Sequence, residues 1–313
     1  MRVTNRMMND DVFRNTQAQL EKLSNLQNEI ASGKAVTKPS DNPSAVNQAM
    51  LLQNTLSDQD QYVKNIDMVN TWLDTADQSL GDATTVMQRA RELAVQGASG
   101  TLTPQSRSDI AKEVRQLSEQ LRGIANTQIA GRYIFAGSQT LTTPYPPTNP
   151  TANPPVFPPP PVYPNPAPAN VDSTSPLTAE IGPQQTIQYN VTGTDAFGAT
   201  TDPNSAFQVL EDLASALDTN NTTAISTQID RIDSRLDAID LQRADIGGKR
   251  NRTTLLENSY SATSVSLKDL LSKDTDVDIP QVVSDMTLAQ QVFQASLAAG
   301  AKIIQPTLLD FLK

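Results

Sequence analysis

Proline is distributed so unevenly along this chain that it divides the sequence into parts. The chain has 313 residues and 21 prolines, and sixteen of those prolines lie between Ser138 and Pro203. Because proline lacks a backbone N–H and fixes φ, we expect that this stretch cannot be helical. On both sides of it, apolar residues recur at helical spacing over most of the chain. The sequence therefore predicts a mainly α protein whose two helical halves are separated by a variable insert over 138–203.

The insert itself admits two interpretations. Its run of prolines from Pro158 to Pro161, and the absence of Lys and Arg from the whole stretch, are typical of a disordered or polyproline linker. The segment from Thr186 to Thr192 instead has the composition of a β-strand. We therefore expect either a linker or a small β-containing insert with a loose proline-rich loop.

The helical pattern is clearest after residue 225. Apolar residues follow a 3-4 repeat there, with polar residues at some of the same positions, which predicts a coiled-coil-like helix of about 50 residues. The Gly247-Gly248 pair is its weakest point, because adjacent glycines lower helix stability. The apolar positions are Ile229, Ile232, Leu236, Ile239, Ile246, Tyr260, Leu267 and Leu271, and the polar ones are Arg243, Arg250, Thr253, Glu257 and Ser264.

The first half of the chain supplies partners for that helix. Asp41 is a candidate N-cap for a helix that begins around Pro43 and continues towards Gly97. After a turn, a second helix is expected from about Gln105 to Ala130. Helices joined by short turns pack antiparallel, so these helices and the later one should form an elongated bundle from residues 41–137 and 204–278.

The two ends of the chain, 1–40 and 279–313, each carry an amphipathic stripe. Such helices need a partner in water, because a helix of this length is marginal alone. The sequence leaves two partners open: the protein's own bundle, or neighbouring copies in a self-assembled structure. The candidate assembly residues are Phe13, Leu20, Leu23, Ile30, Met286, Phe293, Leu297, Ile304, Leu308, Leu309, Phe311 and Leu312.

Composition excludes several functions. Without Cys or His, the chain has no thiolate nucleophile, no imidazole base and no ordinary zinc site, and we expect neither catalysis nor a cofactor. A net charge of −10 opposes nucleic-acid binding, and no apolar run predicts a signal peptide or a membrane span. The acidic segment from Asp274 to Asp278 lacks the glycine and distant glutamate of a calcium loop, so we expect Asp278 to cap a helix instead.

Four segments, taken in order, resemble a known family. The stretch 31–43, with Ser40, Asp41 and Pro43, resembles the segment that joins the two N-terminal helices of flagellins and flagellar hook-associated proteins. The segments 193–198 and 301–312 are similar to the hook-associated proteins of that superfamily, as is 131–137, which contributes Gly131, Arg132, Tyr133, Phe135 and Gly137. The likeness covers both helical halves, and the proline-rich stretch 144–168 has no counterpart.

The resemblance implies a structural subunit of the bacterial flagellum, at the junction between hook and filament. It implies a flagellin-like bundle, terminal coiled-coil helices that build an inner tube, and an outer insert. It further implies export through the flagellar type III apparatus to the cell exterior. The expected partners are other copies of the chain in a ring or tube, a neighbouring hook-associated protein, flagellin and a cytoplasmic export chaperone. Flagellin itself is the alternative from the same superfamily, and a secreted enzyme with helical arms is a third hypothesis.

Overall fold

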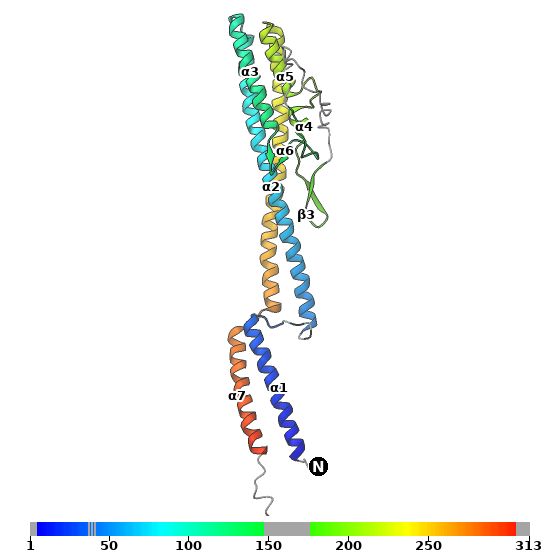
Figure 1. Cartoon of the computed structure of the whole chain (residues 1–313), viewed down its shortest axis with the longest axis vertical. Coiled ribbons are helices and arrows are strands. Elements are labelled where there is room, and N and C mark those ends of the chain that lie inside the picture. Colours follow the sequence, from blue (N-terminus) through cyan, green and yellow to red (C-terminus); the bar gives the residue numbers. More distant parts are fainter. Residues whose placement is uncertain (1–4, 37, 39, 41, 147–175, 305–313) are drawn as a thin grey trace, which may run out of the picture. The chain divides into compact units, whose positions relative to one another are not determined.

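A computed structural model describes residues 5–36, 38, 40, 42–146 and 176–304, and these are mainly helical (Figure 1). The chain divides into two units, residues 1–58 with 261–313 and residues 59–260. The two longest helices contribute to both units. The helices are α1 (Asn5–Ser32), α2 (Pro43–Ala98), α3 (Pro104–Ala125), α4 (Gly193–Phe197), α5 (Ala206–Asp218), α6 (Thr222–Thr275) and α7 (Ile279–Ile304), and the strands are β1 (Gln128–Ile129), β2 (Arg132–Tyr133), β3 (Thr178–Gly182) and β4 (Gln185–Gln188).

In the first unit, the N-terminal helix α1 packs against the C-terminal helix α7 (Figure 1). The end of α1 and the start of α7 are tied by a short antiparallel bridge between Lys34 and Asp276. The amide of Ala35 donates to the carbonyl of Thr275 at 2.8 Å, and the amide of Val277 donates to the carbonyl of Gly33 at 3.1 Å. The two terminal helices are therefore antiparallel partners of each other.

The start of α7 follows the predicted capping chemistry. The carboxylate of Asp278 accepts a hydrogen bond from the amide of Gln281 at 3.3 Å, which confirms Asp278 as a cap. At the start of α2 the side chain of Asn42 accepts from the amide of Ala45 at 3.2 Å. Asp41, the residue we expected in that role, lies outside the described residues.

In the second unit, α2, α3, α5 and α6 surround one apolar core (Figure 1). The predicted inward positions of α3 are confirmed: Ile110, Val114 and Leu121 are buried, and Leu117 and Ile124 pack against the core. On α6, isoleucines seven residues apart are fully or almost fully buried, which is the pattern of a coiled-coil seam. They are Ile225, Ile232, Ile239 and Ile246.

Beyond Ile246 the seam between α2 and α6 becomes polar. Arg250 pairs with Asp74 at 2.6 Å, and the buried hydroxyl of Thr253 donates to the side chain of Asn70 at 2.6 Å. The helix α6 is nevertheless continuous through Gly247 and Gly248. The diglycine thus weakens the helix without breaking it.

The helix α3 ends five residues earlier than predicted, at Ala125 rather than Ala130. Asn126 stops it by binding the chain further on: its side chain donates to the carbonyl of Tyr145 at 2.7 Å and accepts from the amide of Tyr145 at 3.0 Å. Residues 128–133 then form the β1–β2 hairpin. At its tip Ala130 and Gly131 both have positive φ, the conformation that a two-residue hairpin turn requires.

The described part of the insert contributes to the core of the second unit. Strands β3 and β4 form a second antiparallel hairpin, in which Ile181 and Ile187 are buried. The strand predicted at 186–192 is present only in its first part, as β4 at Gln185–Gln188. The short helix α4 contradicts our expectation that this stretch cannot be helical, because its five residues, Gly193–Phe197, include no proline. Aromatic rings that pack edge to face or tilted anchor the insert at its root, namely those of Phe135, Tyr145, Phe197 and Phe207. The proline-rich run lies outside the described residues, and our three-part division of the chain stays a prediction.

Candidate assembly surfaces

The helices α1 and α7 approach each other closely and share a small apolar contact. A Cβ atom on Gly300 would lie 3.0 Å from Cγ1 of Val12, so the two helices approach closely there. Small side chains on α7 permit this close approach, and they leave little apolar surface to bury. The buried members are Leu26, Val282 and Ala289, and Leu23, Ile30, Val277 and Met286 pack against them.

A second set of large apolar side chains points away from this contact. Phe13 on α1 is 64% exposed and Leu20 is 50% exposed. On α7, Leu288 is 59% exposed and Leu297 is 50% exposed, with Ile279, Val283 and Val292 also exposed. Single exposed leucines are ordinary, but several on one two-helix pair leave apolar surface that proteins commonly cover with a partner. We call the exposed residues Phe13, Leu20, Leu288, Val292 and Leu297 together the outer stripe. Leu288 and Leu297 are nine residues apart, so at 3.6 residues per turn they lie on opposite sides of α7.

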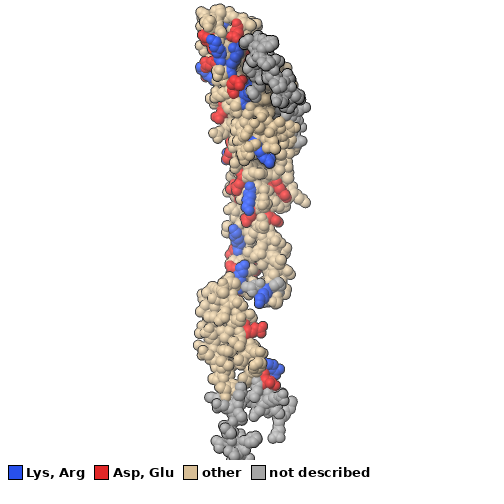
Figure 2. Space-filling model, in the orientation of Figure 1, with Lys and Arg blue, Asp and Glu red and all other residues tan. Residues whose placement is uncertain are grey.

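The α7 part of the outer stripe lies on a stretch of helix without charge. The sixteen residues from Met286 to Ala301 include no Asp, Glu, Lys or Arg. In Figure 2 the surface of the α1–α7 pair is correspondingly mostly tan, with few charged groups on this face. A solvent-facing helix normally carries charge on its outer side, so this composition is typical of a helix that packs on more than one side.

The predicted assembly residues thus fall into three groups. Leu23, Ile30 and Met286 pack between α1 and α7, and Phe293 is half-buried. Phe13, Leu20 and Leu297 belong to the outer stripe. The side chain of Ile304, and Leu308, Leu309, Phe311 and Leu312, lie outside the described residues.

The predicted assembly residues of α7 are divided between its sides. Met286 packs against the cluster that α7 shares with α1, Phe293 is half-buried and Leu297 is 50% exposed. Val282 and Ala289, which are buried in that cluster, were not among the predicted residues. Because α7 is apolar on more than one side, a single stripe does not describe it.

The residues of the family-like motifs have local structural roles. Pro43 is the first residue of α2, and Ser40 is exposed. Gly131 and Gly137 have positive φ, Arg132 is exposed, Tyr133 is half-buried and Phe135 is buried in the aromatic cluster. The 131–137 motif therefore shapes the hairpin and anchors the insert.

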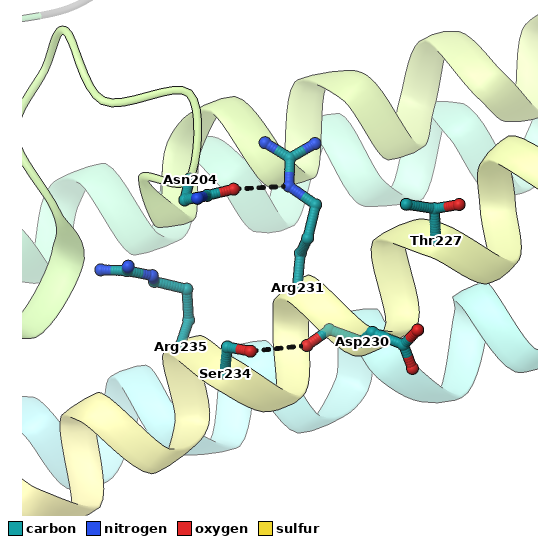
Figure 3. Close-up of a pocket in the computed structure, with 6 residues that line it drawn as sticks. All are labelled: Asn204, Thr227, Asp230, Arg231, Ser234 and Arg235. Carbon is teal, nitrogen blue, oxygen red and sulfur yellow. Dashed lines mark hydrogen bonds between the residues drawn. The ribbon is translucent and has the colours of Figure 1, made fainter.

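One surface hollow, of about 220 Å³, lies on α6 (Figure 3). The guanidinium of Arg231 donates to the side chain of Asn204 at 3.0 Å and pairs with Asp212 at 2.8 Å. Arg235 lies 3.9 Å from Asp202. Both cations therefore face carboxylates, so the hollow joins α6 to the loop before α5 and has no excess of positive charge for an anion.

The described part of the chain has neither a membrane-spanning helix nor a cluster of metal ligands. None of its helices has the length and apolarity needed to cross a membrane. Nor do three or more Asp or Glu side chains come together there as metal ligands. In the acidic segment that superficially resembled a calcium loop, the carboxylate of Asp276 instead accepts a hydrogen bond from Ser272 at 2.6 Å.

Comparison with known proteins decides the family. Residues 3–140 match the model of the bacterial flagellin N-terminal helical region, and residues 229–312 match that of the flagellin C-terminal helical region. The chain belongs to the flagellin family. The two matches leave out residues 141–228, which hold most of the insert together with α5 and the start of α6.

Relatives within the family include hook-associated proteins and flagellins. The flagellar hook-associated protein 3 of Salmonella typhimurium is 26% identical, and the alignment covers 95% of each chain. The flagellin of Bacillus subtilis is also 26% identical, over 88% of this chain and 87% of its own. A crystal structure of the flagellar junction protein FlgL from Legionella pneumophila has the same fold, with a TM-score of 0.54, 14% identity, and coverage of 72% of this chain and all of that one.

Proposed function

We propose that this chain is a structural subunit of the bacterial flagellum that forms the junction between hook and filament. The proposal is supported by the alignment with hook-associated protein 3, which spans nearly the whole of both chains. The single structural observation that carries it is the outer stripe of α1 and α7, with its uncharged stretch from Met286 to Ala301. In this role, terminal helices of neighbouring copies cover one another's outer stripes and build a ring or tube.

The same proposal defines the partners and the location. Copies of the chain are the first partner, and a neighbouring hook-associated protein and flagellin are the partners at the two ends of the ring. A cytoplasmic chaperone covers the apolar C-terminal helix before export, since an uncharged apolar helix is prone to premature association. The assembled protein lies outside the cell, and its work is assembly rather than catalysis.

Flagellin is the alternative function from the same family. A B. subtilis flagellin aligns with 88% of this chain, so the fold alone does not separate the two roles. The modest insert and the ending Leu308-Leu-Asp-Phe-Leu312 favour the junction.

Deletion of the gene in the parent bacterium distinguishes the two roles. Loss of a junction subunit should leave hooks without filaments and release unpolymerised flagellin into the medium. Loss of the flagellin should leave hooks without filaments and no released flagellin. Electron microscopy of the cells and immunoblots of the medium measure both, and an intact filament in the deletion strain would contradict both roles.

The outer stripe is tested by two exposed leucines of α7. The variant L288Q/L297Q should fold as wild type, because both side chains are at least half exposed, but should fail to assemble. Leu241 on α6 is 68% exposed and lies in the second unit, so L241Q is a matched control that should still assemble. Sedimentation of the purified chains measures assembly, and L288Q/L297Q that polymerises like wild type would contradict the assignment of this surface.

A further inference from the structure

Gly247 and Gly248, the diglycine in the middle of α6, lower the stability of the helix, and no packing contact requires glycine at either position. A Cβ atom built on Gly247 or on Gly248 meets no other atom within 4 Å, so alanine fits at both positions. Glycine in a helix interior is less favourable than alanine by roughly fivefold in the helix equilibrium, per residue. Two adjacent glycines therefore leave α6 markedly easier to distort at this point than elsewhere.

Two other helical glycines, Gly97 and Gly300, have a packing reason that the diglycine lacks. On Gly97 of α2 a Cβ would lie 2.3 Å from Cδ2 of Leu217, and on Gly300 of α7 it would lie 3.0 Å from Val12. On Gly81 it would lie 3.8 Å from the guanidinium of Arg243, an ordinary contact. The diglycine thus has no neighbour that requires the absence of a side chain.

The contacts on either side of the diglycine are of a kind that tolerates movement. Arg243 pairs with Asp77 at 2.9 Å, and Arg250 pairs with Asp74 at 2.6 Å. These four side chains are between 38% and 49% exposed. Half-exposed pairs of long side chains re-form easily after a small displacement, because each contributes little and its geometry is loose.

On both sides of the diglycine, α6 is held firmly. Directly before it, Ile246 is 1% exposed and packs in the core. After it, the hydroxyl of Tyr260 donates to the carbonyl of Ile181 in β3 at 2.7 Å, and the ring of Tyr260 stacks on that of Tyr62 of α2. The side chain of Asn65 fixes the same hairpin by donating to the carbonyl of Glu180 at 2.7 Å. A weak, polar, glycine-containing stretch between two fixed parts is the arrangement of a bend point.

We propose that α6 bends at Gly247-Gly248 within the second unit while the segments on either side stay packed on α2. The use of this bend rests on the proposed function. A junction subunit contacts both copies of itself and unlike neighbours, and a bend in the long helix lets one chain meet different contact angles.

The variant G247A/G248A tests the proposal, because alanine stiffens the helix and clashes with nothing. Gly123 of α3 is also helical, exposed and free of atoms within 4 Å of a Cβ, so G123A is the matched control. In hydrogen exchange of the full-length chain, wild-type amides at 245–252 should exchange faster than those at 230–240. The double variant should slow them by about tenfold or more, and G123A should leave them unchanged.

Complementation of the deletion strain supplies the second readout. We expect G247A/G248A to be exported and folded but to restore filaments and swimming poorly, and G123A to restore both. The proposed bend is wrong if wild-type amides at 245–252 exchange as slowly as those at 230–240. Normal swimming of the strain with G247A/G248A would also contradict it. A deletion strain that keeps its filaments would instead refute the proposed function, and the exchange comparison would still decide whether α6 bends.

Discussion

Among single residues, Arg107 has the most distinctive environment. It is only 4% exposed, although it carries a charge. Its guanidinium donates to the carbonyls of Gly97 at 2.9 Å and Ser99 at 2.7 Å, and to the side chain of Asn220. Arg107 thereby fastens the turn between α2 and α3 to the turn between α5 and α6. No pattern in the sequence identified it, because an arginine at a helix start is ordinary.

We expect R107A to lower the free energy of unfolding by about 3 kcal/mol, because it leaves the carbonyl of buried Gly97 and the side chain of Asn220 without this donor. R107K should lose nearly as much, since a single ammonium cannot reach all three acceptors. Arg115 pairs with Asp218 near the surface, so R115A is a control that should cost less than about 1 kcal/mol. Urea unfolding of the three variants measures this, and equal losses in R107A and R115A would contradict the role of Arg107.

Tyr260 gives the fold a dependence on alkaline pH. Burial raises the pKa of its hydroxyl, and neighbouring Tyr62 raises it further. Because the pKa is higher in the folded chain than in the unfolded one, the neutral hydroxyl contributes stability below about pH 10, and this contribution is lost as the pH rises above that value. Unfolding free energies of wild type and Y260F should therefore converge between about pH 9 and about pH 12. A constant difference across that range would contradict this account.

At the scale of elements, Gly97 sets how closely α2 and α5 pack. Leu217, which a Cβ on Gly97 would meet at 2.3 Å, is itself 1% exposed, so it would have to shift within the core. We expect G97A to destabilise the second unit by about 1–3 kcal/mol through overpacking, despite its higher helix propensity. Thermal unfolding followed by circular dichroism measures the loss. A G97A chain that melts at or above the wild-type temperature would show that Leu217 repacks without cost.

The long helices were predictable because their signals are local. The heptad of isoleucines identified the inner face of α6, and Pro43 and Asp278 marked helix starts that the structure confirms. The end of α3 was not predictable in this way. It depends on Asn126 binding Tyr145, a contact across 19 residues that no periodicity encodes.

The terminal helices were predictable only in part, for a related reason. Their amphipathic character follows from the sequence, but the choice of inner face depends on which partner each face meets. Ala289 packs against α1 because a small residue allows close approach, and larger Leu288 and Leu297 are left outside. The predicted residues therefore include one that packs towards α1, Met286, and one that is exposed, Leu297.

At the scale of the whole molecule, the outer stripe of each chain must be covered by neighbouring copies of the same chain. Among the side chains that the structure describes, α1 and α7 bury Leu26, Val282 and Ala289 between them, with four others packed around these, so the contact alone holds the two helices weakly. We therefore expect α1 and α7 to be largely unfolded in the monomer and to order on assembly, when burial of the outer stripe offsets the loss of conformational entropy.

Hydrogen exchange of the full-length chain, as a monomer and as a polymer, measures this directly. The account predicts that amides of α1 and α7 exchange rapidly in the monomer and slow by about a hundredfold or more in the polymer. Amides of α3, which lie in the second unit, should be protected in both states and serve as the internal reference. Terminal helices that are as well protected in a dilute monomer as in the polymer would contradict the central claim.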